Sequence, residues 1–143
     1  MRKRREGAYK LLNQVHEGLF TATNGLVGGT ASGMTVVKLT TVGRKSGAER
    51  TTMLTSPLVE DNTVFLVASY RGGPKHPAWY LNLAATPQVQ AMRRGADLAM
   101  RARTLDGEER EQVWRRVVSL QPRYATYQSR TERQLPLIEL TPA

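Results

Sequence analysis

The sequence predicts a small antiparallel β-barrel of mainly β character, an α+β fold in which a few short helices pack against the strands. About six short runs rich in Thr, Val and other strand formers are separated by Gly, Pro, Asn and Asp. The helical patterns between these runs are short and fewer in number. The chain has 143 residues, 40% hydrophobic and 23% charged, which is typical of one folded domain with its own core.

The N-terminal region carries a helical pattern that ends in a glycine-rich connection. Residues 8–20 place four apolar side chains on one stripe, which is typical of an amphipathic helix, and a basic tail precedes them at positions 2–5. Four glycines between positions 25 and 33 disfavour both helix and strand. We therefore expect residues 1–33 to form a basic helix with its connection, and residues 34–143 to form the barrel domain.

The first strands of the barrel follow directly. Residues 34–42 are rich in Thr and Val, residues 43–47 form a turn, and residues 50–59 form the returning strand of a β-hairpin. Asp61 and Asn62 mark the next turn, and residues 63–69 have the β-branched and apolar character of a buried central strand.

A Gly/Pro-rich loop separates this sheet segment from a short helix over residues 78–85, which Pro87 ends. Residues 88–93 and 97–103 flank the turn signal Arg94-Gly95 and form a second hairpin. Five strands are then in place.

The C-terminal part begins with the clearest helical pattern of the chain. Asp106 with Glu109 three residues later resembles a capping box, and apolar residues then recur at helical spacing up to Pro122. A short helix within residues 122–133 carries Tyr124 and Tyr127, and residues 136–140 form the last strand.

Composition limits the classes of function. The chain contains no cysteine, which excludes disulfides, thiolate nucleophiles, iron–sulfur clusters and cysteine zinc sites, and no metal site is predicted. No apolar run follows the charged N-terminus that is long enough for a signal peptide or a membrane span, so we expect a cytoplasmic protein. The formal charge of +9 indicates an anionic partner: nucleic acid, an acidic membrane surface or a phosphorylated ligand.

The basic residues gather on the first hairpin. Its turn holds Arg44, Lys45 and Ser46 between two glycines, and Arg50 lies just beyond, so cations, a hydroxyl and backbone N–H groups can face one anion. The spacing of a nucleotide-binding P-loop is absent, and a strand follows in place of a helix. A solvated hairpin tip is the alternative, because exposed charges often bind nothing.

A second group of residues favours the binding interpretation. Lys75 and His76 lie in the Gly/Pro-framed loop after the central strand, where binding sites tend to lie, and Trp79 next to them could cover a flat ring. A core position for Trp79 is the alternative.

Three segments in the same order resemble the deazaflavin (F420)-dependent nitroreductase family: LTTVGRKSGAERTTML, VASYRGGPKHPAWYLNLAATPQV and YATYQSRTERQLPLIELTP, at residues 39–54, 67–89 and 124–142. The resemblance implies a split β-barrel related to the flavin-mononucleotide-binding barrels. It also implies coenzyme F420, whose tail carries a phosphate and glutamates, as the cofactor.

The resemblance further implies which residues form the site. The cofactor-binding positions by motif are Arg44, Lys45, Ser46, Arg50, Thr52, Met53, Leu54, Ser69, Lys75, Pro77, Trp79 and Asn82. The family usually has proline where Met53 stands, so Met53 is also a candidate for substrate contact. Candidates for the proton-donating or catalytic role are Ser69, Tyr124 and Tyr127, although tyrosines three apart on a helix serve packing equally well.

The function implied is an F420H2-dependent reductase. A deazaflavin donates hydride, and the acceptors implied are planar and electron-poor: quinones, nitroaromatics and activated α,β-unsaturated esters or lactones of the coumarin or aflatoxin type. The alternatives are a flavin-mononucleotide- or haem-binding barrel and, more distantly, a nucleic-acid-binding barrel, whose aromatics should alternate with its cations. We expect a monomer or weak homodimer, with possible peripheral membrane contact through the N-terminal helix.

Overall fold

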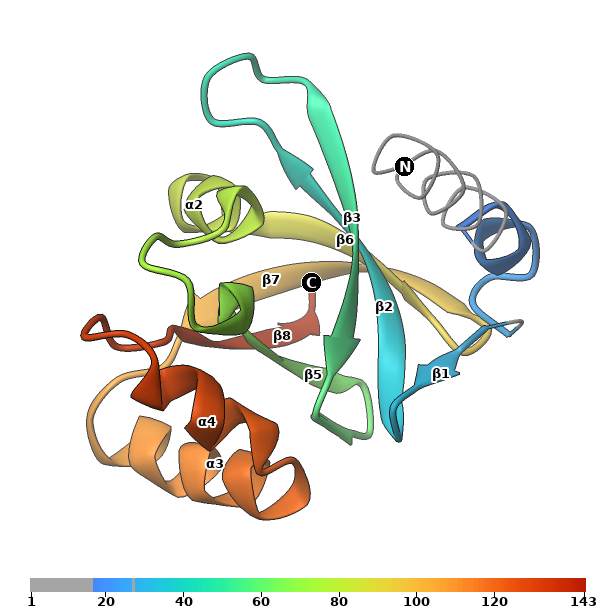
Figure 1. Ribbon diagram of the computed structural model, residues 1–143. Helices are drawn as coiled ribbons and strands as arrows, with labels where there is room; N and C mark the ends of the chain where they lie inside the picture. Colours follow the sequence, from blue (N-terminus) through green and yellow to red (C-terminus); the bar gives the residue numbers. More distant parts are fainter. Residues whose placement is uncertain (1–16, 27) are drawn as a thin grey trace, which may run out of the picture.

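The computed structural model of the protein describes residues 17–26 and 28–143 (Figure 1). The strands form one antiparallel sheet in the order β1-β2-β6-β7-β8-β5-β4, and β3 pairs with β2 away from this path. The sheet curls on itself into a half-barrel, which confirms the split-barrel fold expected from the sequence. The strand bounds are Thr30–Ala31 (β1), Met34–Val42 (β2), Glu49–Ser56 (β3), Leu58–Glu60 (β4), Thr63–Val67 (β5), Gln88–Arg93 (β6), Ala96–Thr104 (β7) and Leu137–Pro142 (β8).

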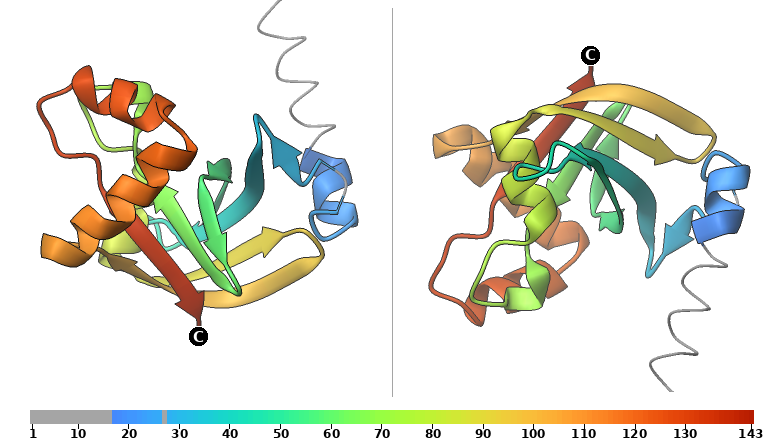
Figure 2. Two further views of the ribbon diagram at one scale, coloured as in Figure 1. Left: turned by 90° about the horizontal axis from the view of Figure 1, so that it is seen from below. Right: turned by 90° about the horizontal axis from the view of Figure 1, so that it is seen from above.

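The helices lie outside the curl. A 3-10 turn, η1 (Tyr70–Gly72), and helix α2 (Ala78–Ala85) follow β5, while α3 (Gly107–Leu120) and α4 (Arg123–Ser129) join β7 to β8. Figure 2 shows α3 and α4 at one side of the sheet and the N-terminal helical segment at the other. The bounds of β2, β6 and α2 coincide with the predicted ones. The predicted strand 63–69 ends earlier, at Val67, because Ser69 turns into η1.

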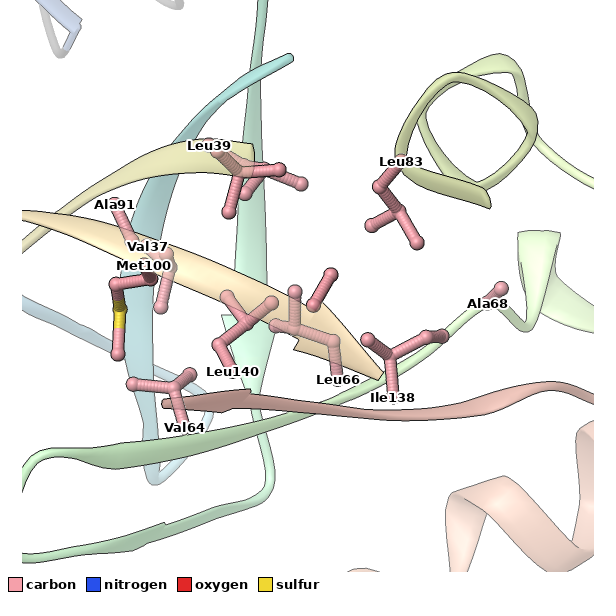
Figure 3. Packing of buried hydrophobic residues seen from close by; sticks show 12 residues of the cluster. Val37, Leu39, Val64, Leu66, Ala68, Leu83, Ala91, Met100, Ile138 and Leu140 are labelled. Carbon is pink, nitrogen blue, oxygen red and sulfur yellow. The ribbon is translucent and has the colours of Figure 1, made fainter. Parts of the chain in front are cut away.

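The main core fills the inside of the curl. Alternate residues of the strands point inward, and Leu83 reaches this cluster from α2, as Figure 3 shows. Val37, Leu39, Val64 and Leu140 are completely buried there. Burying side chains of this size contributes about 1.5–3 kcal/mol each, so the cluster fixes the strands and the helix α2 that border the site.

The predicted strand over residues 50–59 is wrong in one respect, since it breaks at Pro57 into β3 and β4. Proline lacks the N–H that a ladder needs, and the buried Ser56 hydroxyl donates to the carbonyl of Phe65 at 2.6 Å and lies 2.9 Å from that of Leu58. The corner lets β3 pair with β2 and β4 with β5, so one run of sequence serves two parts of the sheet.

A second cluster lies under α3 and α4. It includes Val117 of α3, Tyr124 of α4, and Leu135 and Leu137 at the start of β8. The capping box expected at its edge is not formed. Asp106 is the N-cap residue of α3 and makes no side-chain cap bond. The Glu109 carboxylate, which would complete the box, instead binds Arg103 of β7 in a bidentate pair, with 2.7 Å between Nη1 and Oε1 and 3.0 Å between Nη2 and Oε2.

The N-terminal segment packs on the outside of the sheet. Residues 17–22 are helical, so the helix predicted over residues 8–20 is described only in its last part, and residues 8–16 lie outside the described residues. Phe20 is fully buried against Val36 and Met92, and Lys38 of β2 donates to the hydroxyl of Thr21 at 2.9 Å. Across the described ranges, every helix is too short or too polar to cross a membrane.

Candidate functional site

A pocket of about 840 Å³ lies where the first hairpin, α2 and the turn after β5 meet. This size falls within the usual range for sites that hold a cofactor or another small ligand. Figure 1 shows the tip of the β2–β3 hairpin beside α2, with η1 below them. The residues that line the pocket are Thr41, Gly43, Arg44, Lys45, Ser46, Arg50, Thr51, Thr52, Leu54, Val67, Ser69, Tyr70, Arg71, Pro77, Ala78, Trp79 and Asn82.

The basic hairpin, residues 41–50, closes through a compact turn. The N–H of Gly43 donates to the carbonyl of Ala48 at 2.7 Å, and that of Gly47 donates to the carbonyl of Gly43, also at 2.7 Å. Gly47 has φ +72°, and a Cβ on Gly43 would lie 2.9 Å from the Ser46 hydroxyl. The positive φ favours glycine at position 47, and a side chain at position 43 would require the Ser46 side chain to shift. The Ser46 hydroxyl accepts from the N–H of Ala48 and so helps to fix the turn.

Asn82 of α2 ties this turn to the helix. Its side-chain oxygen accepts from the backbone N–H of Arg44 at 3.2 Å and from Nη1 of Arg44 at 3.0 Å, and its amide nitrogen donates to the Thr41 hydroxyl at 3.3 Å. Asn82 is 5% exposed, so these bonds are shielded from water. Asn82 thus lines the pocket and also anchors the hairpin turn to α2, a role that the sequence could not show.

The cationic part of the pocket lining is open to a ligand. Arg44, Lys45 and Arg50 are exposed, and among the described residues no carboxylate pairs with any of them. The carboxylates that do form ion pairs lie elsewhere, on Glu17, Glu60, Glu109, Glu111 and Glu139. Three cations on one hairpin, two on its turn and one at the start of β3, form no ion pair with a described carboxylate and can bind a polyanion.

The pocket also has an apolar and aromatic lining. Trp79 is half-buried, packs against the main core and lines the pocket with Leu54, Val67 and Pro77. Trp79 therefore has both of the expected positions, in the core and at the pocket. A flat ring system with an anionic tail, as in F420, fits a pocket whose lining combines apolar surface with cations.

The turn between β5 and α2 is strained. Tyr70 has φ +45° and Arg71 has φ +54°, so two successive non-glycine residues adopt the left-handed conformation, which costs roughly 1–2 kcal/mol for each. The Tyr70 side chain is 66% exposed at the edge of the pocket. Strain of this kind persists only where the surroundings impose it, and it is found mainly at functional sites.

Arg133 imposes part of this conformation from the segment before β8. Its guanidinium donates to the carbonyls of Ala68 (3.1 Å), Ser69 (2.8 Å) and Gly73 (2.8 Å), and lies 3.0 Å from Nδ1 of His76. Burial lowers the pKa of Arg133, and burial together with the Arg133 charge lowers the pKa of His76. Arg133 could not be identified from the sequence, because this residue is 60 or more positions away in the chain from the loop residues whose carbonyls it contacts.

Two of the expected cofactor-binding residues do not line the pocket. Met53 alternates with Thr52 and Leu54 along β3, so its side chain points to the opposite face and packs against the Phe20 cluster. The Met53 side chain thus faces away from this pocket, which does not support its suggested contact with substrate there. Lys75 is exposed and does not line the pocket, whereas Pro77, two residues further along the chain, does.

The two candidate catalytic tyrosines also lie outside the pocket. Tyr124 is 4% exposed in the second core cluster, its hydroxyl lies 3.5 Å from the sulfur of Met34, and burial raises its pKa. Tyr127 packs edge-on against it with ring centroids 5.8 Å apart. Of the three candidate catalytic residues, only Ser69 lines the pocket.

A half-barrel whose pocket is lined by both cations and an aromatic ring defines a split-barrel protein that binds a phosphorylated ring cofactor. The chain belongs to the F420H2-dependent quinone reductase family, whose profile matches residues 12–142. It is thus an F420H2-dependent reductase with coenzyme F420 as its cofactor, as the motifs predicted.

Individual relatives agree with this assignment. An F420H2-dependent quinone reductase of Mycobacterium tuberculosis is 32% identical over 135 residues, which cover 91% of this chain and 89% of the relative. A solved F420H2-dependent reductase is 40% identical with a TM-score of 0.67, over 74% of this chain and 93% of the other. A solved domain-swapped dimer is 34% identical with a TM-score of 0.67, over 98% of both chains.

Proposed function

We propose that the pocket binds F420H2 with its anionic tail at the basic hairpin and its ring against Trp79, and that the acceptor is a quinone. The observation that carries this proposal is that cations and apolar surface line the same pocket. Arg44, Lys45 and Arg50 come from the basic hairpin, whereas Trp79 of α2 lines the pocket together with Leu54, Val67 and Pro77. Ser46 of the turn and Thr52 of β3 add hydroxyls to the lining.

When bound, F420H2 supplies the hydride, so the protein has to position the acceptor and deliver a proton. The hydroxyl of Ser69 lines the pocket on the side of the strained turn, and that of Tyr70 lies at its edge. Either hydroxyl can donate a hydrogen bond to the oxygen of a quinone and pass on a proton from water. Leu54, Val67 and Pro77 exclude water from the opposite wall.

The choice of a quinone rests on the named activity of the relatives and on the shape of the pocket edge. Tyr70 presents an aromatic ring with 66% of its surface exposed, against which a planar acceptor can stack. Nitroaromatics and activated coumarin- or aflatoxin-type lactones share planarity and electron deficiency with quinones. They are the competing acceptors in the test.

The test is the oxidation of F420H2, followed by the return of ring fluorescence, with menadione, a nitroaromatic and a coumarin lactone as acceptors. We expect the highest kcat/KM with menadione. A higher kcat/KM for the lactone or the nitroaromatic would reject the quinone assignment while keeping the reductase. Flavin mononucleotide and haem serve as alternative ligands; no His or Met of the described residues lines the pocket to ligate haem iron.

Two partner surfaces belong to the same proposal. Leu19 and Leu26 are 51% and 70% exposed on the N-terminal segment, and with the basic charge of the chain they support peripheral contact with an anionic membrane in which apolar quinones dissolve. Co-sedimentation with anionic vesicles, but not with neutral ones, is the expected result. The domain-swapped relative supports a homodimer, with a monomer as the alternative, and light scattering decides between them.

A further inference from the structure

The strained turn, residues 69–73, needs an external support because its own backbone does not favour it. Tyr70 and Arg71 occupy left-handed conformations, and the hydrogen bonds within the turn are those from Gly72 N–H to the Ser69 carbonyl at 2.8 Å and from Gly73 N–H to the Tyr70 carbonyl at 2.9 Å. Left alone, such a turn would relax and carry Ser69 and Tyr70 away from the pocket.

The C-terminal segment supplies the support. Three nitrogen atoms of Arg133 reach three carbonyl groups of residues 68–73 and the ring of His76, so one planar group fixes both ends of the loop. Behind the turn, α4 approaches so closely that a Cβ on Gly72 would lie 2.5 Å from the carbonyl oxygen of Tyr127.

Arg133 is itself held in place. Gln128 of α4 donates from Nε2 to the carbonyl of Arg133 at 2.8 Å and accepts from the N–H of Leu135 at 2.9 Å. The side chain of Arg133 is half-buried, so these bonds form with limited competition from water. A continuous set of hydrogen bonds therefore runs from α4 to the wall of the pocket.

We propose that Arg133 is a positioning residue for the reductase reaction: it holds the strained turn so that Ser69 and Tyr70 face the acceptor. This proposal rests on the proposed function of the pocket. Arg133 does not itself line the pocket, so it acts through the turn and not by contact with cofactor or substrate. The bonds require a neutral His76 that accepts at Nδ1, and lysine could not reproduce them because its ammonium has no planar fork.

The test compares Arg133→Gln and Arg133→Lys with Arg110→Gln. Arg110 is a matched control: it is 5% exposed, donates to the carbonyl of Leu135 at 2.8 Å and stacks on Trp114, but it does not touch the turn. For each variant we would measure the melting temperature, the F420H2 dissociation constant, and kcat and KM with menadione. A Gln128→Met variant retains the guanidinium and removes only its support, which provides a milder change if Arg133→Gln fails to fold.

We expect Arg133→Gln to lower kcat/KM roughly 10- to 100-fold, because small displacements of positioning groups cost that much. The dissociation constant of F420H2 should change by less than about threefold, since the basic hairpin that holds the anionic tail is intact. Arg133→Lys should recover little, and Arg110→Gln should lower the melting temperature without a comparable loss of kcat/KM.

A second readout is the titration of His76 by NMR, which is simple because the chain has only two histidines. Its ring faces Arg133 and packs edge-on against Tyr80 of α2, with centroids 5.1 Å apart, and Lys75 precedes it in the chain. Removal of the Arg133 charge should raise the pKa of His76 part of the way back toward 6.5.

The outcomes separate the two proposals. If the wild-type protein binds and oxidises F420H2 but Arg133→Gln and Arg110→Gln have equal kcat/KM, the positioning role is overturned and the proposed function remains. If the wild-type protein does not bind F420H2, the proposed function fails, and a role for Arg133 in that reaction fails with it.

Discussion

The side-chain oxygen of Asn82 accepts two hydrogen bonds from Arg44, one from the backbone N–H at 3.2 Å and one from Nη1 at 3.0 Å. The two residues are 38 positions apart, and the bonds fasten the tip of the basic hairpin to the middle of helix α2. Helix α2 therefore holds the cationic turn in place before a ligand binds, and the same helix carries Trp79.

Asn82→Leu should weaken F420 binding by roughly 3- to 30-fold, because the loss of a buried hydrogen-bond acceptor for a charged donor costs about 1–2 kcal/mol. Asn82→Asp keeps the acceptor for Arg44 but places a carboxylate beside it and removes the donor to Thr41, so it should also weaken the binding of the anionic cofactor. Isothermal titration of both variants against the wild-type protein measures the difference. Equal affinities for Asn82→Leu and the wild-type protein would show that the hairpin needs no anchor.

Tyr70→Asn should raise the KM for menadione several-fold without lowering stability. Asparagine tolerates a left-handed backbone better than tyrosine does, so the turn keeps its conformation while the exposed ring is lost. Leu120→Asn is the control, since Leu120 is also exposed, at 55%, and lies at the end of α3 away from the pocket lining. An unchanged KM in Tyr70→Asn would remove Tyr70 from the acceptor site.

The proton donor can be identified by removing single hydroxyl groups. Ser69→Ala should lower kcat by roughly 100-fold or more if its hydroxyl delivers the proton, since a positioned proton donor typically contributes about 100- to 10,000-fold. Tyr124→Phe should leave kcat within about twofold, because the Tyr124 hydroxyl is buried against Met34 and cannot meet the acceptor. A large kcat loss in Tyr124→Phe alone would reverse this assignment.

Stability should fall as the pH drops below 6.5, in part because of His76. Burial and the Arg133 charge lower its pKa in the folded protein, whereas the unfolded chain takes up the proton near 6.5. Between these two pKa values the unfolded state binds more protons than the folded state, so the free energy of unfolding rises with pH. The stabilising contribution of His76 is fully present above pH 6.5. The free energy of unfolding can be measured with urea for the wild-type protein and His76→Gln on both sides of pH 6.5. It should fall less on acidification in the variant than in the wild-type protein.

The elements that the sequence predicted well are those whose signals are local. The strand Met34–Val42 and the helix Ala78–Ala85 match their predicted bounds because alternation, Thr/Val content and flanking prolines act within a few residues. The break at Pro57 has a local signal as well, because proline lacks the N–H that a ladder needs, but the strand predicted over residues 50–59 runs through it. The missing capping box depends on a side chain of another element, since Arg103 of β7 takes the carboxylate of Glu109.

The same division holds in the site. The motifs brought together Lys45, Arg50, Trp79 and Ser69, all of which line the pocket. Helical spacing, however, does not show which face of α4 meets the barrel. Tyr124 was therefore a catalytic candidate by sequence, although its side chain lies in the second core cluster. Arg133 escaped notice because a lone arginine gives no sequence signal of the four acceptors around it.

The most direct test of the account is the titration of the apo protein with F420, followed by ring fluorescence, with flavin mononucleotide as a second ligand. The double reversal Lys45→Glu with Arg50→Glu is compared with a reversal of equal charge at Arg115 and Arg123, which are exposed on α3 and α4. We predict preference for F420 over flavin mononucleotide, and at least about 100-fold weaker F420 binding in the hairpin variant alone, because charge-assisted bonds contribute about 1.5–3 kcal/mol each. Equal losses in both variants, or no F420 binding by the wild-type protein, would contradict the assignment of this pocket as the cofactor site.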